Sequence, residues 1–276
     1  VDVSALPSTS NERPPACFVS EGLYEKPSDF IRQLVSALPA SEELTRAQLL
    51  FVVRFASACD EVWEDREKAP AQRRVHRLLL LGAGGCGKTH VIKHIVFPAV
   101  QYIWPELLPK SPSLIVVASS NAQAKNISTP AVSGRTMHNA GCVGIQKMNN
   151  VSLRAGKKKT ALETLWCSCQ VLVIEEVSMV AAAHYNMLDF RAMCGRSMSH
   201  NVCERVYAQP GCSFGRMPIV IHLGDFLQLT PTAALSLITD VNATDERGRY
   251  VLQTPDLEIQ HAIKVFTDIE DVFELK

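Results

Sequence analysis

Eight consecutive residues have the composition of a phosphate-binding loop. Gly82-Ala83-Gly84-Gly85-Cys86-Gly87-Lys88-Thr89 follow an apolar run and precede a helical pattern. Glycines let the backbone curl so that successive N–H groups face phosphate oxygens, and the N-terminus of the next helix favours the same anion. In such a loop the lysine reaches the β- and γ-phosphates and the threonine hydroxyl ligates Mg²⁺. We therefore predict a nucleoside triphosphate site made by Gly82, Gly84, Gly85, Cys86, Gly87, Lys88, Thr89 and the adjoining His90.

A pair of carboxylates follows a second apolar run. Residues 171–180 read VLVIEEVSMV, so that a buried strand would end at Glu175 and Glu176. Strand-end carboxylates beside a phosphate loop supply a magnesium site and orient a water. Asp followed by Glu is the usual pair, and Glu in place of Asp adds about 1.5 Å of reach. Misplacement by about 1 Å can cost roughly a hundredfold in rate, so we expect Mg-nucleotide binding to persist and hydrolysis to be slowed.

The elements that position these residues are short apolar runs alternating with helical segments. HRLLLLG, SLIVVAS, QVLVIEE and PIVIHLG are continuous apolar stretches, as expected for parallel strands covered on both faces. Helical patterns follow three of them. The alternation predicts an α/β fold with a doubly wound, mainly parallel sheet, whose ligands bind at the carboxyl ends of the strands.

The flanking regions differ in composition. Residues 1–75 contain a leader rich in Pro and Ser, a short helix that Ser28 would cap, and a helix to about Trp63 that opens with the capping box of Thr45 and Gln48. A charged stretch at 64–74 would be a surface linker. We expect the nucleotide-binding domain to span 76–235, with a possible small insertion at 139–170, followed by a C-terminal segment, 236–276, with one helix near 258–266.

Four motifs in order resemble those of a helicase family. The phosphate loop is followed by VVASSNAQAKNISTPAVSGRTMH at 116–138, VIEEVSM at 173–179 and HLGDFLQL at 222–229. Their order and spacing resemble the superfamily 1B DNA helicases, the PIF-like and RecD-like group. The GDFLQL element is the most specific, because other phosphate-loop ATPases place a different polar sensor there. The resemblance implies a RecA-like ATPase domain with an N-terminal helical extension.

The resemblance also implies residue roles. Lys88, Glu176 and Gln228 would be catalytic: Lys88 holds phosphates, Glu176 polarises the attacking water and Gln228 senses the γ-phosphate. Thr89 and Glu175 would hold Mg²⁺, and Thr136 and His138 would lie along single-stranded DNA. Gln48 matches an adenine-reading glutamine, although its place in the capping box gives it a purely structural alternative. The basic run at 157–159 would be either a DNA contact or a solvated face.

The function implied is an ATP-dependent 5′-to-3′ DNA helicase that uses ATP and Mg²⁺ and acts on single-stranded DNA and duplex junctions, in processes such as repair, recombination or telomere maintenance. The chain after Gln228 is too short for the second motor domain of such helicases, so we expect a fragment that is weakly active alone. The alternative is a nucleotide-gated DNA-binding module that does not unwind. GDFLQL argues against a third class, the loader-type ATPases.

Bulk composition sets further limits. Apolar residues make up 47% of the 276 residues, enough for a full core, and no apolar run approaches the roughly 20 residues that span a bilayer. Lys plus Arg equals Asp plus Glu, 28 each, so any nucleic-acid groove must be local. Nine cysteines without a CxxC pair favour reduced thiols in an intracellular protein. We expect a monomer without a membrane segment, in the nucleus.

Overall fold

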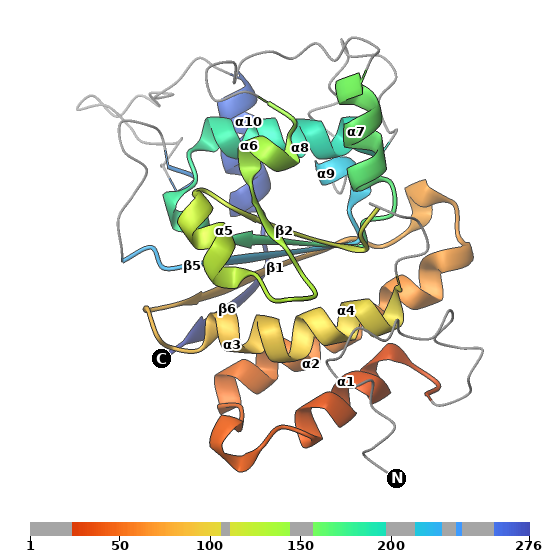
Figure 1. Cartoon of the computed structure of the whole chain (residues 1–276), viewed down its shortest axis with the longest axis vertical. Coiled ribbons are helices and arrows are strands. Elements are labelled where there is room, and N and C mark those ends of the chain that lie inside the picture. Colours follow the sequence, from red (N-terminus) through yellow and green to blue (C-terminus); the bar gives the residue numbers. More distant parts are fainter. Residues whose placement is uncertain (1–23, 106–110, 144–156, 197–212, 228–235, 239–256) are drawn as a thin grey trace, which may run out of the picture.

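A six-stranded, all-parallel sheet forms the centre of the computed structural model (Figure 1). The structure describes residues 24–105, 111–143, 157–196, 213–227, 236–238 and 257–276. The strand order is β3-β2-β4-β5-β1-β6. The strands are β1 (His76–Gly82), β2 (Leu114–Ala118), β3 (Gly134–Thr136), β4 (Val171–Glu175), β5 (Ile219–Gly224) and β6 (Asp271–Leu275). The predicted α/β class with a parallel sheet is therefore confirmed.

The four apolar runs form the four inner strands. Every residue of β2, β4 and β5 is buried, because helices cover both faces of the sheet. The edge strands β3 and β6 were not predicted. β3 has only three residues, Gly134–Thr136, and β6 alternates between half-buried and exposed positions until the buried Leu275, so neither shows a continuous apolar run.

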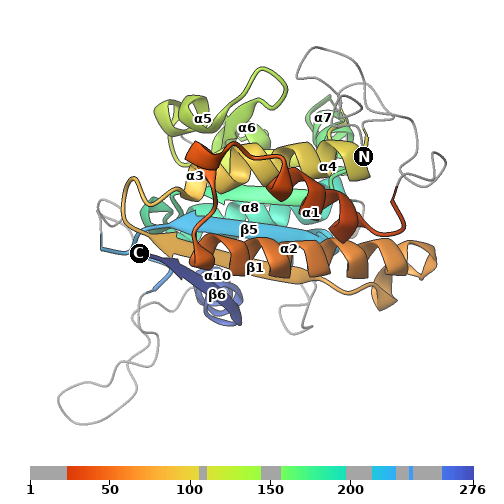
Figure 2. The same ribbon diagram turned by 90° about the horizontal axis from the view of Figure 1, so that it is seen from below.

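Helices cover the two faces of the sheet in separate layers (Figures 1 and 2). Two buried clusters divide the apolar side chains of the central strands, with Leu78 and Leu80 in one and Leu79 in the other, as the two-residue period of a strand requires. The first layer contains α1 (Pro27–Ser36), α2 (Arg46–Glu64), α3 (Lys88–Val91), a π-helical segment (Ile92–Val96) and α4 (Phe97–Ile103).

The remaining helices lie beside the second face or at the strand ends. They are α5 (Asn121–Ile127), α6 (Met137–Ala140), α7 (Lys157–Trp166), α8 (Ala182–Gly195), α9 (Ser213–Arg216) and α10 (Leu257–Thr267). Trp166 of α7 is fully buried and donates its indole N–H to the Ala140 carbonyl at 3.0 Å. Among the described residues, no helix combines the length and the apolar character needed to cross a membrane.

The N-terminal helices belong to the same core as the sheet. The predicted capping box of α2 is present: Thr45 accepts from the Gln48 backbone N–H, and the Gln48 side chain accepts from the Thr45 N–H at 2.8 Å. The predicted Ser28 cap of the first helix is wrong. Lys26 occupies the cap position, and Pro27 takes the first turn, where its missing N–H costs nothing.

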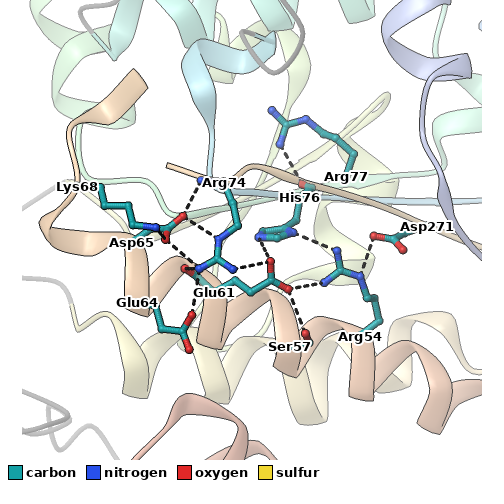
Figure 3. Close-up of polar contacts among 10 residues, drawn as sticks. All are labelled: Arg54, Ser57, Glu61, Glu64, Asp65, Lys68, Arg74, His76, Arg77 and Asp271. Atoms are coloured by element: carbon teal, nitrogen blue, oxygen red, sulfur yellow. Dashed lines mark hydrogen bonds and ion pairs between the residues drawn. The ribbon is translucent and has the colours of Figure 1, made fainter. Parts of the chain in front are cut away.

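A polar network anchors the linker between α2 and β1 (Figure 3). Asp65, expected on the surface, is buried and accepts three hydrogen bonds from Arg74 at 2.8–2.9 Å, with the Lys68 ammonium at 2.7 Å. These bonds hold the pKa of Asp65 well below its usual range. Arg54 of α2 pairs with Asp271 of β6 at 2.9 Å. The network therefore ties α2 to the strands that frame the phosphate loop.

Candidate nucleotide site

The glycine-rich loop connects β1 to α3, at the carboxyl edge of the sheet. Gly87 has a φ of 90°, a left-handed conformation that favours glycine, and a Cβ at this position would lie 2.3 Å from Gln48 Nε2. Gly82 is equally constrained, since its Cβ would lie 2.8 Å from the Leu275 carbonyl oxygen. The loop conformation thus depends on glycine both for backbone dihedrals and for space beside α2 and β6.

Lys88 is the first residue of α3 and is buried, with 6% of its surface exposed. Its ammonium donates to the carbonyl oxygens of Gly82 and, at 3.1 Å, Ala83. The charge is therefore held above the curled loop, where the P-loop geometry places a phosphate. Gly84 and Gly85 form the exposed turn of the loop, and Gly85 also has a positive φ of 86°.

Glu175 lies at the end of β4 and meets the P-loop helix. Glu175 is 5% exposed, and the neighbouring Thr89 side chain acts to lower the pKa of its carboxyl group. Burial, followed by the neighbouring Glu176 charge, raises the pKa of Glu175 to about 7, although Lys88 and Lys93 act in the opposite direction. The carboxyl oxygen Oε2 of Glu175 is buried without a hydrogen-bond partner. Thr89 and Glu175, predicted from separate motifs, are thus in contact.

Glu176 has an uncommon backbone conformation. Its φ and ψ are both 51°, in the left-handed region that costs a non-glycine residue about 1–2 kcal/mol. The turn separates Glu176 from the strand and leads into a short 3-10 helix, Val177–Met179. Its Oε2 is also buried without a partner. Strained backbone of this kind is concentrated at functional sites, where the surrounding structure maintains it.

The residues at this edge of the sheet fit a magnesium ion. Mg²⁺ prefers oxygen ligands and is commonly held by one or two carboxylates, with waters and substrate phosphates completing the octahedron. Thr89 offers a hydroxyl, and Glu175 and Glu176 each offer a buried oxygen that lacks a protein partner. A bound cation would offset the repulsion between these two carboxylates and favour their ionised forms.

Gln48 contacts the phosphate loop as well as capping its own helix. Its side-chain Nε2 donates to the Cys86 carbonyl oxygen at 3.2 Å, while Oε1 remains engaged with the Thr45 N–H. Gln48 is 5% exposed. Sequence reasoning offered adenine reading and capping as alternatives. The structure shows the capping box and adds a third role, support of the loop.

The other predicted nucleotide ligands, Cys86 and His90, occupy different surroundings, as does Asp225, which was not predicted as a ligand. The half-buried Cys86 has its sulfur 3.9 Å from Lys88 Nζ. His90 turns toward the segment between α1 and α2, with Nε2 3.4 Å from the Glu42 carbonyl oxygen. Asp225, which follows β5, is buried and accepts from the Leu227 N–H at 3.0 Å. The predicted γ-phosphate sensor, Gln228, lies outside the described residues, so its role stays a prediction.

Thr136 and His138, the predicted DNA contacts, also lie at the carboxyl edge of the sheet, but beside the edge strand β3 and not beside β1. Thr136 ends β3 and caps α6 by accepting from the Asn139 N–H at 3.2 Å. The ring of His138 lies 5.2 Å from the ring of His184 on α8, and its Nε2 is buried without a hydrogen-bond partner. β2, β4 and β5 separate these residues from β1, so nucleotide and DNA would bind at different ends of one edge.

Comparison with known proteins identifies the family. The profile described as PIF1-like helicase matches residues 58–244, more than half of the chain. The chain belongs to the PIF1-like helicase family. It is 30% identical over 160 residues to the ATP-dependent DNA helicase PIF7 of Trypanosoma brucei brucei, covering 56% of this chain and 13% of that protein. It is 28% identical to mouse PIF1 over 154 residues, covering 56% and 19%.

Solved PIF1 structures show lower similarity. The Candida albicans Pif1 helicase is 24% identical with a TM-score of 0.46, and the alignment covers 70% of this chain and 35% of that one. A Bacteroides Pif1 double mutant is 19% identical with a TM-score of 0.47, covering 84% and 42%. This PIF1-like chain therefore spans at most a fifth of the curated relatives it matches and less than half of these solved chains.

One residue near the site of this PIF1-like chain was not predicted from the sequence. The charge of Lys93 acts to lower the pKa of Glu175, and its ammonium donates to the Asn126 carbonyl at 2.7 Å. Residues four apart on a helix share a face, so the interval from Thr89 to Lys93 could have revealed it. It was overlooked because lysine is common on exposed helices and the motif ends at Thr89.

Proposed function

We propose that this chain is an ATP-binding motor domain of a DNA helicase, in which nucleotide hydrolysis is coupled to 5′-to-3′ movement on single-stranded DNA. The observation that carries the proposal is the convergence of Lys88, Thr89, Glu175 and Glu176 at the carboxyl ends of β1 and β4. The curated relatives are named ATP-dependent DNA helicases, which supports the same substrate and reaction.

Each residue has a distinct task in this proposal. Lys88 leaves the loop carbonyls to neutralise the β- and γ-phosphates, while the loop N–H groups hold the phosphate chain. Mg²⁺, when bound, would neutralise developing phosphate charge, with Thr89 and Glu175 as its protein ligands. Glu176 accepts the hydrogen bond of the attacking water and thereby orients it.

Movement on DNA requires contacts beyond the nucleotide site. Thr136 and His138 are candidates, because they share the sheet edge with the phosphate loop. A second motor domain supplies arginines in related two-domain helicases, and such a residue can be worth about 10³–10⁵ in rate. We therefore propose that the present 276 residues bind nucleotide, bind single strands weakly, and neither unwind nor hydrolyse efficiently alone.

The first test is equilibrium binding of a fluorescent ATP analogue with Mg²⁺ or with EDTA. We expect tight binding that requires Mg²⁺ and is lost in Lys88→Ala. Lys264, an exposed residue of α10, gives a control substitution away from the loop, Lys264→Ala, which should leave the affinity unchanged. Failure of the parent chain to bind the analogue in either buffer would contradict the proposed function.

A nucleotide-gated DNA-binding module is the second candidate, favoured by the position of Glu175 beside Thr89. The longer glutamate reaches the hydroxyl that would ligate Mg²⁺, so hydrolysis could be lost while nucleotide binding remains. Glu175→Asp separates the two functions. In a longer chain with a second motor domain, DNA-stimulated hydrolysis by the parent would support the motor. Hydrolysis only after Glu175→Asp would support the gated module.

A further inference from the structure

A cluster of side chains that could bind a metal ion lies where the P-loop helix meets the turn between α1 and α2. Glu42 ends a short 3-10 turn between α1 and α2, His90 belongs to α3, and His94 to the π-helical segment. One potential ligand atom from each residue lies within 4.8 Å of the others. We propose that Glu42, His90 and His94 form a site for a transition-metal ion of the zinc class, separate from the Mg²⁺ of the nucleotide.

The spacing of the two histidines suits a metal. His90 and His94 are four residues apart, so their rings project from the same side of the helix, with centroids 4.5 Å apart. The His94 Nδ1 lies 3.8 Å from Glu42 Oε2. The helix changes to π geometry at Ile92, between the histidines, and single π turns are often found at functional sites.

The geometry requires only a small closure. Ligands about 2.0–2.2 Å from a tetrahedral zinc ion stand roughly 3.3–3.6 Å from one another. The three atoms must therefore approach by about 1 Å, which side-chain torsions can supply because Glu42 and His90 are half-buried and His94 is exposed. The Glu42 carbonyl oxygen lies 3.4 Å from His90 Nε2, so the His90 ring already contacts the turn that carries Glu42.

The ligand types determine the class of ion. Two imidazoles and one carboxylate suit Zn²⁺ and neighbouring divalent ions, whereas Mg²⁺ prefers oxygen ligands alone. Three protein ligands leave a fourth position for water or for another ligand. The bound ion would join the turn at Ala40–Glu42 to the helix that begins with Lys88 and Thr89. Metal binding would thereby restrain the P-loop helix without occupying the nucleotide site.

The site is tested by titrating the chain with Co²⁺, whose visible d–d absorption reports tetrahedral nitrogen and oxygen ligation, and then displacing Co²⁺ with Zn²⁺. A thiol-free reductant keeps the cysteines reduced. We expect one equivalent of metal to bind, and an affinity at least about tenfold lower in Glu42→Gln and in His94→Ala. Glu43→Gln, which changes an exposed neighbouring carboxylate, is the matched control and should bind as the parent does.

Three results would overturn the proposal. The first is the absence of saturable binding by the parent chain, and the second is binding that Glu42→Gln and His94→Ala leave unchanged. The third is near-ultraviolet charge-transfer absorption from Co²⁺–thiolate bonds, which would place the metal on the cysteines. Circular dichroism of each variant verifies folding, and the exposed position of His94 makes its replacement tolerable. None of these readouts depends on ATP, so the outcome is independent of the proposed helicase function.

Discussion

Gln48 both caps α2 and contacts the phosphate loop, and these two roles can be separated by mutation. In Gln48→Ala, α2 loses the side chain that accepts from the Thr45 N–H, and the Cys86 carbonyl loses its Nε2 donor. A net hydrogen bond is worth about 0.5–1.5 kcal/mol, so the loss of loop support should weaken nucleotide binding by roughly 2- to 10-fold. The fluorescent ATP analogue in the presence of Mg²⁺ measures this change directly.

Thr45→Ala provides the matched control. It removes the hydroxyl that caps α2, at a cost of about 1 kcal/mol, and leaves the Gln48 amide free to reach Cys86. Both variants should therefore lose stability in urea unfolding, but only Gln48→Ala should lose nucleotide affinity. Equal affinities for the two variants would refute loop support as a function of Gln48.

Gln48→Ala also distinguishes loop support from base recognition. The Gln48 Oε1 is committed to the Thr45 N–H, and Nε2 is committed to Cys86, which leaves one amide hydrogen for a base. If Gln48 supports the loop, Gln48→Ala should weaken ATP binding and GTP binding by the same factor. Loss of affinity for ATP alone would instead establish the adenine-reading role.

Three further predictions follow from the site and the linker. Above pH 7, without metal or nucleotide, Glu175→Gln should be more stable to urea than the parent chain by up to about 3 kcal/mol. The reason is that the folded parent keeps the Glu175 proton to about pH 7, whereas the unfolded parent releases it above about pH 4.5. The difference in stability should vanish below pH 4.5. Glu176→Gln should retain nucleotide affinity and lower single-turnover phosphate release by about 10²-fold, and unchanged release would exclude Glu176 as the water-orienting group. Asp65→Ala should cost about 1.5–3 kcal/mol in thermal or urea unfolding by leaving Arg74 without its buried acceptor, whereas Glu67→Ala, on an exposed pair, should cost almost nothing.

The sequence was sufficient wherever the signal is local. The phosphate loop is contiguous, and its glycines specify the backbone of Gly82–Gly87 by themselves, so loop and following helix could both be predicted. Continuous apolar runs located β1, β2, β4 and β5, and the Thr45–Gln48 capping box placed the start of α2 within a residue. The order of the helicase motifs also gave the family before any comparison.

Tertiary structure decided what depends on residues distant in sequence. Glu175 is an ordinary strand-end glutamate in the sequence, and only burial beside Glu176 raises its pKa. The sequence placed Asp65 on the surface, whereas in the structure it is buried and bonded to Arg74.

Contacts across long intervals show the same limit. The Gln48–Cys86 bond spans 38 residues, and His90 meets Glu42 across 48. Local backbone preferences are encoded by neighbouring residues, whereas desolvation and contacts between separate elements arise only when the layers pack together. The sequence therefore determined which chemical groups this PIF1-like domain carries, and the packing of the helices against the sheet decided which of them meet.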